Sequence, residues 1–523
     1  MSHSAEDEQR GQAATMALLA DPATYGLPAE AEVRRIDTHA AAIFLAGARA
    51  FKVKKAVKLP FLDFSTLALR EAACRNELTL NRRTAPGLYL GMRPVARGPG
   101  GTLALDGAGE TVDWVIEMHR FADDALMDRV ATDGRLTMPM LDRLADAIAR
   151  FHLSAERYED DDPPAEFARL ARVNADRFRT FSGSVFDPDM VAAVIARTED
   201  WVARSAGQLS RRCREGFVRH CHGDLHLRNI YLNGDQPELF DAVEFDDRLA
   251  RSDVAYDLAF LLMDLWHRGL KAEANRVLNR YLLRTGDYEG LASMPLFLSL
   301  RAGIRAHVSA TMAESADDAG PVAEEARQYL TLARDLLEPR PAMLLAVGGF
   351  SGSGKSTLAR ALAHRVGPVP GAVCLRSDEL RKLLHGVEPE EALPKSAYAG
   401  AVSAQVYGEL QSRCRRVLAQ GHAAIADAVH NRADGRAVLV AVAADSDVPF
   451  RGIWLTVPEH VMAARIAGRR GDASDADASV MRHQLREGAG AMDWQMLEAG
   501  GALEDTVAKA LAVLPRDCCA ADG

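Results

Sequence analysis

The sequence lacks any apolar run of the roughly 20 residues that a membrane-spanning helix needs. Its first residues, MSHSAEDEQRGQ, are polar and acidic and do not show the basic and then apolar pattern of a signal peptide. Only seven cysteines occur among 523 residues, without the regular spacing of a disulfide framework. These absences predict a protein of a reducing compartment with no membrane partner, and we expect it in the cytoplasm.

Basic residues are also in deficit, because 63 Lys and Arg stand against 73 Asp and Glu and give a net charge of −10. Long nucleic acids are bound by clustered cations, so this balance argues against them as partners. Hydrophobic residues at 48% and charged residues at 26% are typical of globular proteins with large cores. A chain of this length predicts two or three domains.

The periodicity of apolar residues changes along the chain. An N-terminal segment without a clear pattern is expected to be disordered or poorly packed. A strand-rich part containing one helix precedes a mostly helical part, then a short segment with two prolines predicts a linker. Beyond it, apolar strands alternate with helices, which predicts an α/β domain with a parallel sheet. The predicted boundaries are 1–31 for the first segment, 32–120 and 121–337 for the two parts of the first domain, 338–343 for the linker, 344–515 for the second domain and 516–523 for a tail.

The segment HCHGDLHLRN (220–229) contains the spacing of a phosphoryl-transfer loop. Asp224 can accept a proton from an attacking hydroxyl, and Asn229, five residues later, can reach a metal ion. A short hairpin follows, and we expect its turn at Asn233-Gly234. Asp241 comes directly after that hairpin, where a second metal ligand is needed. We therefore predict Asp224 as the catalytic base and Asn229 and Asp241 as metal ligands.

Such a site also needs a lysine for the nucleotide phosphates and a glutamate that holds the lysine. The predicted strand AFKVKK supplies Lys52, with Lys54 on the same face of the strand. The predicted helix at 65–83 supplies Glu77 as the partner of Lys52, and Glu71 is its rival. We assign Lys52 and Glu77 to the nucleotide-binding site.

The segment HGDLHLRN resembles the H-G-D-x-H-x-x-N loop of the aminoglycoside phosphotransferase and choline kinase-like family, a branch of the protein-kinase-like fold. The segment DVAYDLAFLL (253–262) is similar to the helix that follows the metal site in that family. The resemblance covers about residues 32–335 and implies a two-lobed α+β kinase-like domain that uses Mg²⁺ and ATP. It implies the roles given above for Lys52, Asp224, Asn229 and Asp241, a structural role for Asp257, and loop-building roles for His222 and His226.

One departure from the kinase pattern stands ahead of Lys52. The segment THAAAIFLAGA replaces the expected G-x-G-x-x-G loop. Either closure over the nucleotide uses another hairpin, or ATP binds weakly.

A second phosphate-binding motif, GGFSGSGKST (348–357), fits the pattern G-x-x-x-x-G-K-[ST]. It follows a predicted strand and opens a predicted helix, which is the context that a P-loop requires. Backbone N–H groups of such a loop surround phosphate oxygens, Lys355 reaches the β- and γ-phosphates as a catalytic group, and Ser356 reaches Mg²⁺. The predicted nucleotide-binding residues here are Gly349, Ser351, Gly352, Ser353, Gly354, Lys355, Ser356 and Thr357.

Two acidic residues and an arginine cluster follow the P-loop. This order resembles small P-loop kinases such as gluconate kinase, zeta toxin and polynucleotide kinase, within the AAA-type ATP-binding proteins. The resemblance implies Asp378 as base for the acceptor hydroxyl, although Asp378 can also cap the helix that it begins. Asp427 is predicted as a metal ligand at the end of a strand. Arg465, Arg469 and Arg470 are predicted to close over the nucleotide, with a solvated helix face as the alternative.

We expect an ATP- and Mg²⁺-dependent phosphotransferase with two nucleotide-binding centres that act on hydroxyl groups of small molecules. Two alternatives stay open. One domain could be a regulatory nucleotide sensor that gates the other, or the kinase-like domain could phosphorylate protein.

Overall fold

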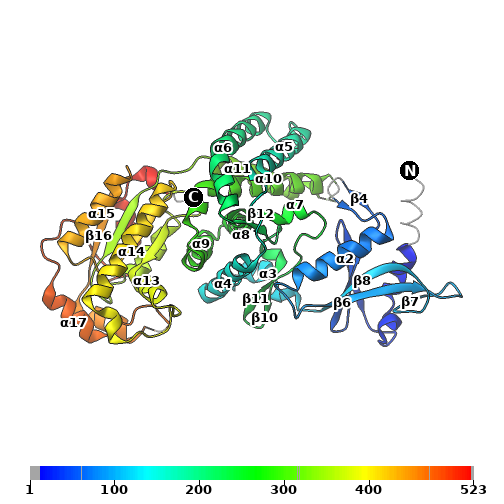
Figure 1. The fold of residues 1–523 in the computed structure, drawn as a ribbon, viewed down its shortest axis with the longest axis horizontal. Coiled ribbons are helices and arrows are strands. Elements are labelled where there is room, and N and C mark those ends of the chain that lie inside the picture. The colour runs from blue at the N-terminus through cyan, green and yellow to red at the C-terminus, as the bar shows by residue number, and fades with distance from the viewer. Residues whose placement is uncertain (1–11, 60–61, 315, 317, 470, 520–523) are drawn as a thin grey trace. The chain divides into compact units, whose positions relative to one another are not determined.

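The computed structural model describes residues 12–59, 62–314, 316, 318–469 and 471–519 (Figure 1). The chain forms two compact units, and each is described by itself. The first consists of Met1–Asp161 with Arg212–Leu261, and the second consists of Asp162–Arg211 with Leu262–Gly523. Among the described residues, no helix combines the length and the apolar character that crossing a membrane demands.

The first unit contains a six-stranded antiparallel sheet in the order β1-β2-β3-β8-β6-β7. The predicted hairpin of two strands before Lys55 is present as β2 and β3. The predicted helix is α2 (Leu67–Asn81), which begins where the Thr66 hydroxyl accepts a hydrogen bond from the Leu69 N–H. The strands are β1 (Val33–Asp37), β2 (Ala41–Ala46), β3 (Arg49–Lys54), β6 (Tyr89–Arg97), β7 (Leu103–Leu105) and β8 (Glu110–His119), and β4 (Lys58–Leu59) pairs with β5 (Leu62–Asp63).

The N-terminal segment packs on this sheet, so the prediction of a disordered segment is wrong for residues 12–27. Residues 12–20 are helical and a short 3-10 helix, η1 (Pro22–Tyr25), follows. Leu19 is fully buried in the apolar cluster on one face of the sheet, and the ring of Tyr25 stacks on Phe51 at 4.4 Å. The apolar residues of this segment are too few to give a periodic pattern, but they are enough to cover that face. Residues 1–11 lie outside the described part.

The rest of the first unit carries the predicted phosphoryl-transfer loop between short strands. The predicted hairpin is present as β10 and β11, but its two-residue turn is Gly234-Asp235 rather than Asn233-Gly234, because Asn233 still pairs with Gln236. The elements are η2 (Asp123–Ala125), α3 (Met127–Thr132), α4 (Met138–Ser154), β9 (Val218–His220), η3 (Leu227–Asn229), β10 (Ile230–Asn233), β11 (Gln236–Leu239), α7 (Asp247–Ala250) and β12 (Arg251–Asp253). The helix α8 (Val254–His267) begins in this unit.

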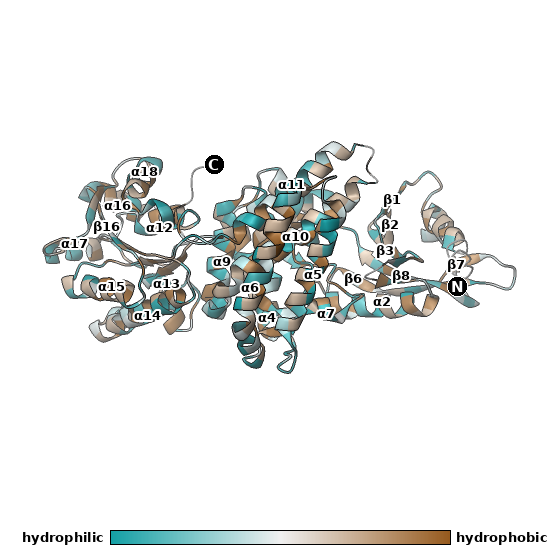
Figure 2. Cartoon of the chain, turned by 90° about the horizontal axis from the view of Figure 1, so that it is seen from above, coloured by the Kyte–Doolittle hydropathy of each residue, from teal (hydrophilic) through white to brown (hydrophobic). Residues whose placement is uncertain are grey.

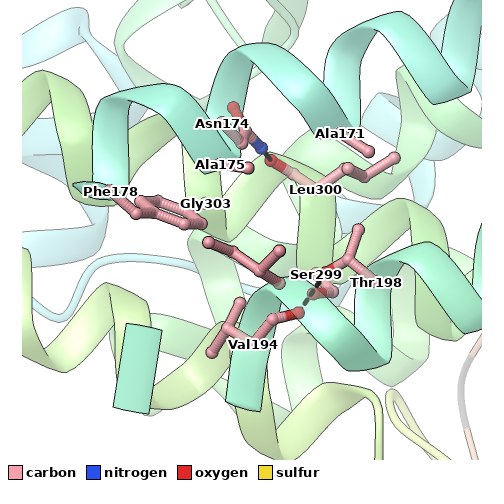
Figure 3. A pocket seen from close by; sticks show the side chains of 10 residues that line it. Ala171, Asn174, Ala175, Phe178, Val194, Thr198, Ser299, Leu300 and Gly303 are labelled. Atoms are coloured by element: carbon pink, nitrogen blue, oxygen red, sulfur yellow. Dashed lines mark hydrogen bonds between the residues drawn. The ribbon is translucent and has the colours of Figure 1, made fainter. Parts of the chain in front are cut away.

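The first part of the second unit is helical, as predicted. Its helices are α5 (Pro163–Phe181), α6 (Pro188–Arg214), α9 (Lys271–Thr285), η4 (Tyr288–Ser293), α10 (Met294–Ala313) and α11 (Ala319–Leu336). A small pocket lies between α5, α6 and α10 (Figure 3). A side chain at Gly303 would collide with Asn174 and Phe178, at 2.8 and 3.0 Å. The Asn174 side chain donates a hydrogen bond to the Leu300 carbonyl at 3.2 Å. We therefore assign the pocket to the packing between these three helices and not to a binding site.

The second part is a five-stranded parallel sheet in the order β14-β15-β13-β16-β17, with helices on both faces, which confirms the predicted α/β domain (Figure 1). Cys518 is fully buried in its apolar core, because η6 folds back toward α12, so the predicted tail packs at least to this residue. The strands are β13 (Leu344–Gly348), β14 (Val373–Arg376), β15 (Ala424–Asp427), β16 (Phe450–Thr456) and β17 (Gln495–Glu498). The helices are α12 (Lys355–Ala363), α13 (Ser377–Leu384), η5 (Lys395–Tyr398), α14 (Gly400–Ala419), α15 (Ala433–Asp445), α16 (Glu459–Ala467), α17 (Ala478–Glu487), α18 (Leu503–Val513) and η6 (Arg516–Cys518).

The outer edge of strand β14 is covered by side chains of α9. The Asn279 Oδ1 atom accepts a hydrogen bond from the Cys374 N–H at 2.6 Å, and its Nδ2 atom donates to the Ala372 carbonyl at 3.2 Å. Asn275 donates to the carbonyls of Ala372 and Pro370, both at 3.1 Å. These amides take the place of a neighbouring strand and leave no exposed edge there. The P-loop sheet is therefore completed by a helix that precedes the predicted linker.

We predict that Asn279→Leu lowers the free energy of unfolding of the second unit by about 1–3 kcal/mol, because it leaves the Cys374 N–H buried without an acceptor. Urea unfolding followed by circular dichroism measures the effect. Glu273→Gln, on the first turn of the same helix, is the control and should stay within about 0.5 kcal/mol of the wild type. Equal stabilities of the two variants would contradict the role given to Asn279.

Candidate active sites

Lys52 of β3 lies between two carboxylates. Its Nζ atom is 2.8 Å from Oε1 of Glu77 on α2 and 2.5 Å from Oδ1 of Asp241. Glu71, the rival candidate, pairs with Arg75 on its own helix at 2.7 Å. Of the two glutamates, the structure thus brings Glu77 to Lys52.

A second lysine shares the same glutamate. Lys54 contacts the other carboxylate oxygen of Glu77 and also Glu244, and all three side chains are buried. Burial alone would lower the pKa of Lys52, but Asp241 and Glu77 outweigh it and raise that pKa. Burial would likewise raise the pKa of Glu77, but Lys52 and Lys54 hold it down at about 2. Lys52 and Glu77 are therefore charged at neutral pH. The sequence indicated Lys54 only through its position two residues after Lys52, which places both side chains on one face of the strand.

A buried polar network that the sequence did not indicate holds α2 against the sheet. Arg70 of α2 donates to Asp113 of β8 at 2.9 Å, and Asp113 also accepts from Gln12 at 2.9 Å. Gln12 in addition donates to the Lys54 carbonyl at 2.6 Å and accepts from the Ala56 N–H at 2.8 Å. The N-terminal helix thereby fixes both the helix that carries Glu77 and the end of the strand that carries the lysines.

Asp241 adopts a backbone conformation that is rare for a residue with a side chain. Its φ is +61°, in the left-handed region, which costs about 1–3 kcal/mol and persists where the surroundings impose it. The Asp241 N–H donates to the Tyr89 hydroxyl at 3.2 Å, and the next N–H donates to Asn81 at 2.9 Å. Asn81 itself donates to the Glu77 carbonyl at 2.9 Å, so α2 holds both Glu77 and the backbone after Asp241.

The side chain of Asn229 forms hydrogen bonds back to Asp224 across the loop. The Asn229 Nδ2 atom donates to Oδ2 of Asp224 at 2.8 Å and to its carbonyl at 2.9 Å. This orientation leaves the Asn229 amide oxygen as the atom that can bind a cation. With the Asp241 carboxylate it provides the oxygen ligands that Mg²⁺ prefers, so these two residues fit the predicted metal site. The Asp224 side chain keeps 42% of its surface exposed, so an acceptor can reach it.

His222 and Asp257 build the base of this loop. The ring of His222 bonds the Phe240 carbonyl at 2.9 Å, and burial lowers its pKa. Asp257 accepts the N–H groups of two loop residues at 3.1 and 2.8 Å and contacts His152 at 3.1 Å. Within the described part of the chain, one group of His, Cys, Asp or Glu side chains has its potential ligand atoms close enough together to hold a metal ion. It consists of His152, Cys221 and Asp257. Because Asp257 already holds the loop backbone, we assign this group to loop architecture.

The second motif forms a tight loop between β13 and α12. Gly352 has a φ of +83°, and a Cβ atom there would lie 2.6 Å from the Met462 carbonyl. The Lys355 Nζ atom donates to the Phe350 carbonyl at 3.2 Å, and burial lowers the pKa of this lysine. The loop and the first turn of α12 contain the remaining predicted nucleotide-binding residues, Gly349, Ser351, Ser353, Gly354, Ser356 and Thr357.

The predicted acidic residues lie at the ends of neighbouring strands. Asp427 is the last residue of β15 and is paired in register with Arg376, the last residue of β14. Burial raises the pKa of Asp427, against the effects of Arg376 and Lys355 and a hydrogen bond from Ser356. Asp378 lies in the first turn of α13, 3.8 Å from Arg376, while Arg376 takes the N-cap position. The carboxyl ends of these strands meet beside the loop, where ligands bind in such sheets.

The predicted arginines differ in their contacts. Arg465 of α16 donates to the Ser353 carbonyl at 3.3 Å and thus lies against the P-loop. Arg469 donates to the Ser474 carbonyl at 3.3 Å and thereby contacts the segment after α16. Arg470 lies outside the described residues.

Comparisons with known proteins match both halves of the chain. Residues 116–294 match the Phosphotransferase enzyme family, and residues 344–489 match the AAA domain family. The uncharacterized protein Rv2004c of Mycobacterium tuberculosis is 32% identical over 451 residues, which are 85% of this chain and 88% of that protein. These matches confirm the predicted fusion of a phosphotransferase domain with a P-loop domain.

Solved structures are similar to each half. A gluconokinase from Sinorhizobium meliloti is 22% identical and covers 33% of this chain and 91% of its own, with a TM-score of 0.25. A choline/ethanolamine kinase family protein from Mesorhizobium loti is 13% identical and covers 61% of this chain and 99% of its own, with a TM-score of 0.35.

We predict that Glu77→Gln lowers the free energy of unfolding of the first unit by about 3–5 kcal/mol at pH 7, because it leaves two buried lysines short of a counter-charge. The pKa of Glu77 is lower in the folded chain than in the unfolded one. Its contribution is therefore present above its ordinary pKa and disappears as the pH falls toward 2.

Urea unfolding at several pH values measures this difference. Glu71→Gln on the same helix is the matched control and should change stability by less than about 0.5 kcal/mol. A Glu77→Gln protein as stable as the Glu71→Gln protein at pH 7 would refute the shared-charge account.

Proposed function

The chain belongs to the same family as the mycobacterial protein Rv2004c, and on that premise we propose that it transfers the γ-phosphoryl group of ATP to hydroxyl groups of small molecules. Two centres carry out this transfer, one in the kinase-like part and one at the P-loop. The observation that carries the proposal is the contact of Lys52 with both Glu77 and Asp241. A charged lysine held between a helix glutamate and an aspartate after a hairpin is the arrangement that protein-kinase-like phosphoryl transfer requires.

In the first centre, Lys52 binds phosphate oxygens of ATP while Glu77 keeps the ammonium in place. Asn229 and Asp241 would hold Mg²⁺, which would neutralise charge on the phosphates. Asp224 orients the acceptor hydroxyl and takes its proton as the oxygen attacks the γ-phosphorus. The exposure of the Asp224 side chain supports a diffusible acceptor.

In the second centre, backbone N–H groups of the P-loop and Lys355 bind the phosphates, and the start of α12 adds positive potential. Ser356 and Asp427 would hold Mg²⁺ at this site, and Ser356 is among the groups that lower the pKa of Asp427 against the effect of burial. Asp378 takes the proton of the acceptor, and Arg465 stabilises charge near the loop. The meeting of three strand ends beside the loop supports this assignment.

A second candidate function, in which one domain senses nucleotide and gates the other, is favoured by one observation. The amides of Asn275 and Asn279 bond the edge of β14, the strand that leads into Asp378. A movement of α9 would therefore displace β14 and, with it, Asp378 of the second centre.

We predict that each centre can be inactivated separately. Asp224→Asn should lower transfer by the first centre about 10²–10⁴-fold, because the hydroxyl loses its base. Lys355→Ala should abolish transfer by the second centre, because the bridge between the β- and γ-phosphates is lost. Incubation with ATP and a metabolite extract, followed by mass spectrometry of phosphorylated products, measures both effects.

Each single variant should keep some of the wild-type products, and the double variant should keep none. Glu71→Gln serves as the control with the full product set. If either single variant loses every product, the centres are not independent and the gating function replaces the proposed one.

A further inference from the structure

Arg376, the last residue of β14, is a buried arginine with one N–H group that has no acceptor. The residue is 6% exposed. Its two terminal nitrogens, Nη1 and Nη2, donate to the carboxylate oxygens of Asp472 at 3.1 and 2.6 Å. Its Nε atom is buried and has no hydrogen-bond partner among the described residues. Oδ2 of Asp427 lies 3.7 Å from Nε, which is longer than a hydrogen bond.

This N–H group lies among the residues assigned to the P-loop centre. Nη2 of Arg376 is 3.8 Å from Oδ2 of Asp378, and Arg376 is paired in register with Asp427. The charges of Asp427, Asp378 and Arg376 all act on Lys355 and affect its pKa. Arg376 is therefore close to the groups proposed to bind the phosphates, to hold the metal ion and to take the proton of the acceptor. A phosphoryl group that moves from nucleotide to acceptor passes between these groups.

The Nε–H group lacks an acceptor and not a counter-charge. The charge of the guanidinium is already compensated by Asp472, which it contacts through two hydrogen bonds. A buried N–H without an acceptor is unfavourable, and nearly all such groups in folded proteins have a partner. A ligand that brings an oxygen atom to this place removes the cost. Phosphate oxygens are charged and accept hydrogen bonds from guanidinium groups strongly.

We propose that Arg376 is a catalytic residue of the P-loop centre: its Nε–H donates to an oxygen of the γ-phosphoryl group while that group moves from ATP to the acceptor. The inference rests on the proposed function of this centre. The bond from the γ-phosphorus to the bridging oxygen breaks, and its electron pair stays on ADP. The acceptor oxygen forms the new bond, and Asp378 takes the acceptor's proton. Arg376 keeps its own proton and stabilises the charge of the moving group.

Asp472 is a positioning residue, because it orients the guanidinium. Binding both terminal nitrogens fixes the plane of this group and hence the direction of the Nε–H. Asp472 itself accepts a hydrogen bond from the Ser474 N–H at 2.9 Å. The helix that follows, α17, is largely hydrophilic (Figure 2), and within its ten residues, all of which the structure describes, only Met481 is buried. Polar contacts such as the pair of Asp472 and Arg376 therefore help to hold this segment in place.

The test uses the full-length chain in an Asp224→Asn background, which silences the first centre. Hydrogen exchange of peptides that cover residues 349–357 is titrated with ADP or with a non-hydrolysable ATP analogue, each with Mg²⁺. The protection of these peptides gives the affinity of the P-loop centre alone. Incubation with ATP and a metabolite extract, followed by mass spectrometry of the products, gives the rate of transfer.

Arg376→Lys keeps a positive charge beside Asp427 and Asp472 but has no Nε–H. It should bind ADP as the background protein does and bind the ATP analogue about 10–100-fold more weakly, the factor for a hydrogen bond to a charged group. Transfer should fall about 10²–10³-fold, as on loss of one donor to a transition state. Arg432→Lys, which changes an exposed arginine paired with Asp434, is the matched control and should behave as the background protein.

Asp472→Asn leaves Arg376 in the chain and carries the test if Arg376→Lys does not fold. It should weaken binding of the ATP analogue by about 2–10-fold, the factor for one neutral hydrogen bond, and leave ADP binding unchanged. If the pair of Asp472 and Arg376 only kept the segment closed over the loop, Asp472→Asn would tighten the binding of both nucleotides. That result would overturn the inference.

Unchanged transfer and analogue binding in Arg376→Lys, or equal weakening of both nucleotides, would also overturn it. In either case the proposed function of the centre stands if Lys355→Ala still removes products that the Asp224→Asn background makes. If the background makes no product that Lys355→Ala removes, the proposed P-loop function fails and takes the inference with it.

Discussion

The carboxylate of Glu77, shared between Lys52 and Lys54, is the interaction on which the kinase-like part depends. Two ammonium groups in a buried place are tolerated only when carboxylates compensate them, so the position of Glu77 cannot vary. The Thr66 cap sets where α2 begins, and the contact of Arg70 with Asp113 sets how it lies on the sheet. The geometry around Lys52 thus follows from the requirement to pair buried charges.

The P-loop part also pairs buried charges, but there a buried arginine lies between two carboxylates. Arg376 is buried at the end of β14, 3.7 Å from Asp427 and 2.6 Å from Asp472, and these carboxylates raise its pKa although burial lowers it. Lys382 of α13 is buried against Asp475 at 2.7 Å. Two ion pairs therefore hold the segment after α16 against β14 and α13, the elements on either side of the start of the helix that carries Asp378.

The sequence predicted the parts of the candidate site that belong to local patterns, and it also predicted Glu77 as the partner of Lys52. The five-residue spacing of Asp224 and Asn229 and the P-loop with its strand and helix are local patterns, and the structure places them on the expected elements. The partners of Gln12 and Asn279, about 100 residues away, were not predicted because their pairing depends on tertiary packing alone. The same holds for Cys518, which has no pattern around it but fills an apolar core.

The central claim is that this chain moves the γ-phosphoryl group of ATP onto small hydroxylated molecules. The most direct measurement uses ATP labelled with heavy oxygen in the γ-phosphate, incubated with the full-length chain, Mg²⁺ and a metabolite extract. The account predicts labelled phosphoryl groups on small molecules and none on protein. Label found only in inorganic phosphate, or only on protein, would contradict it.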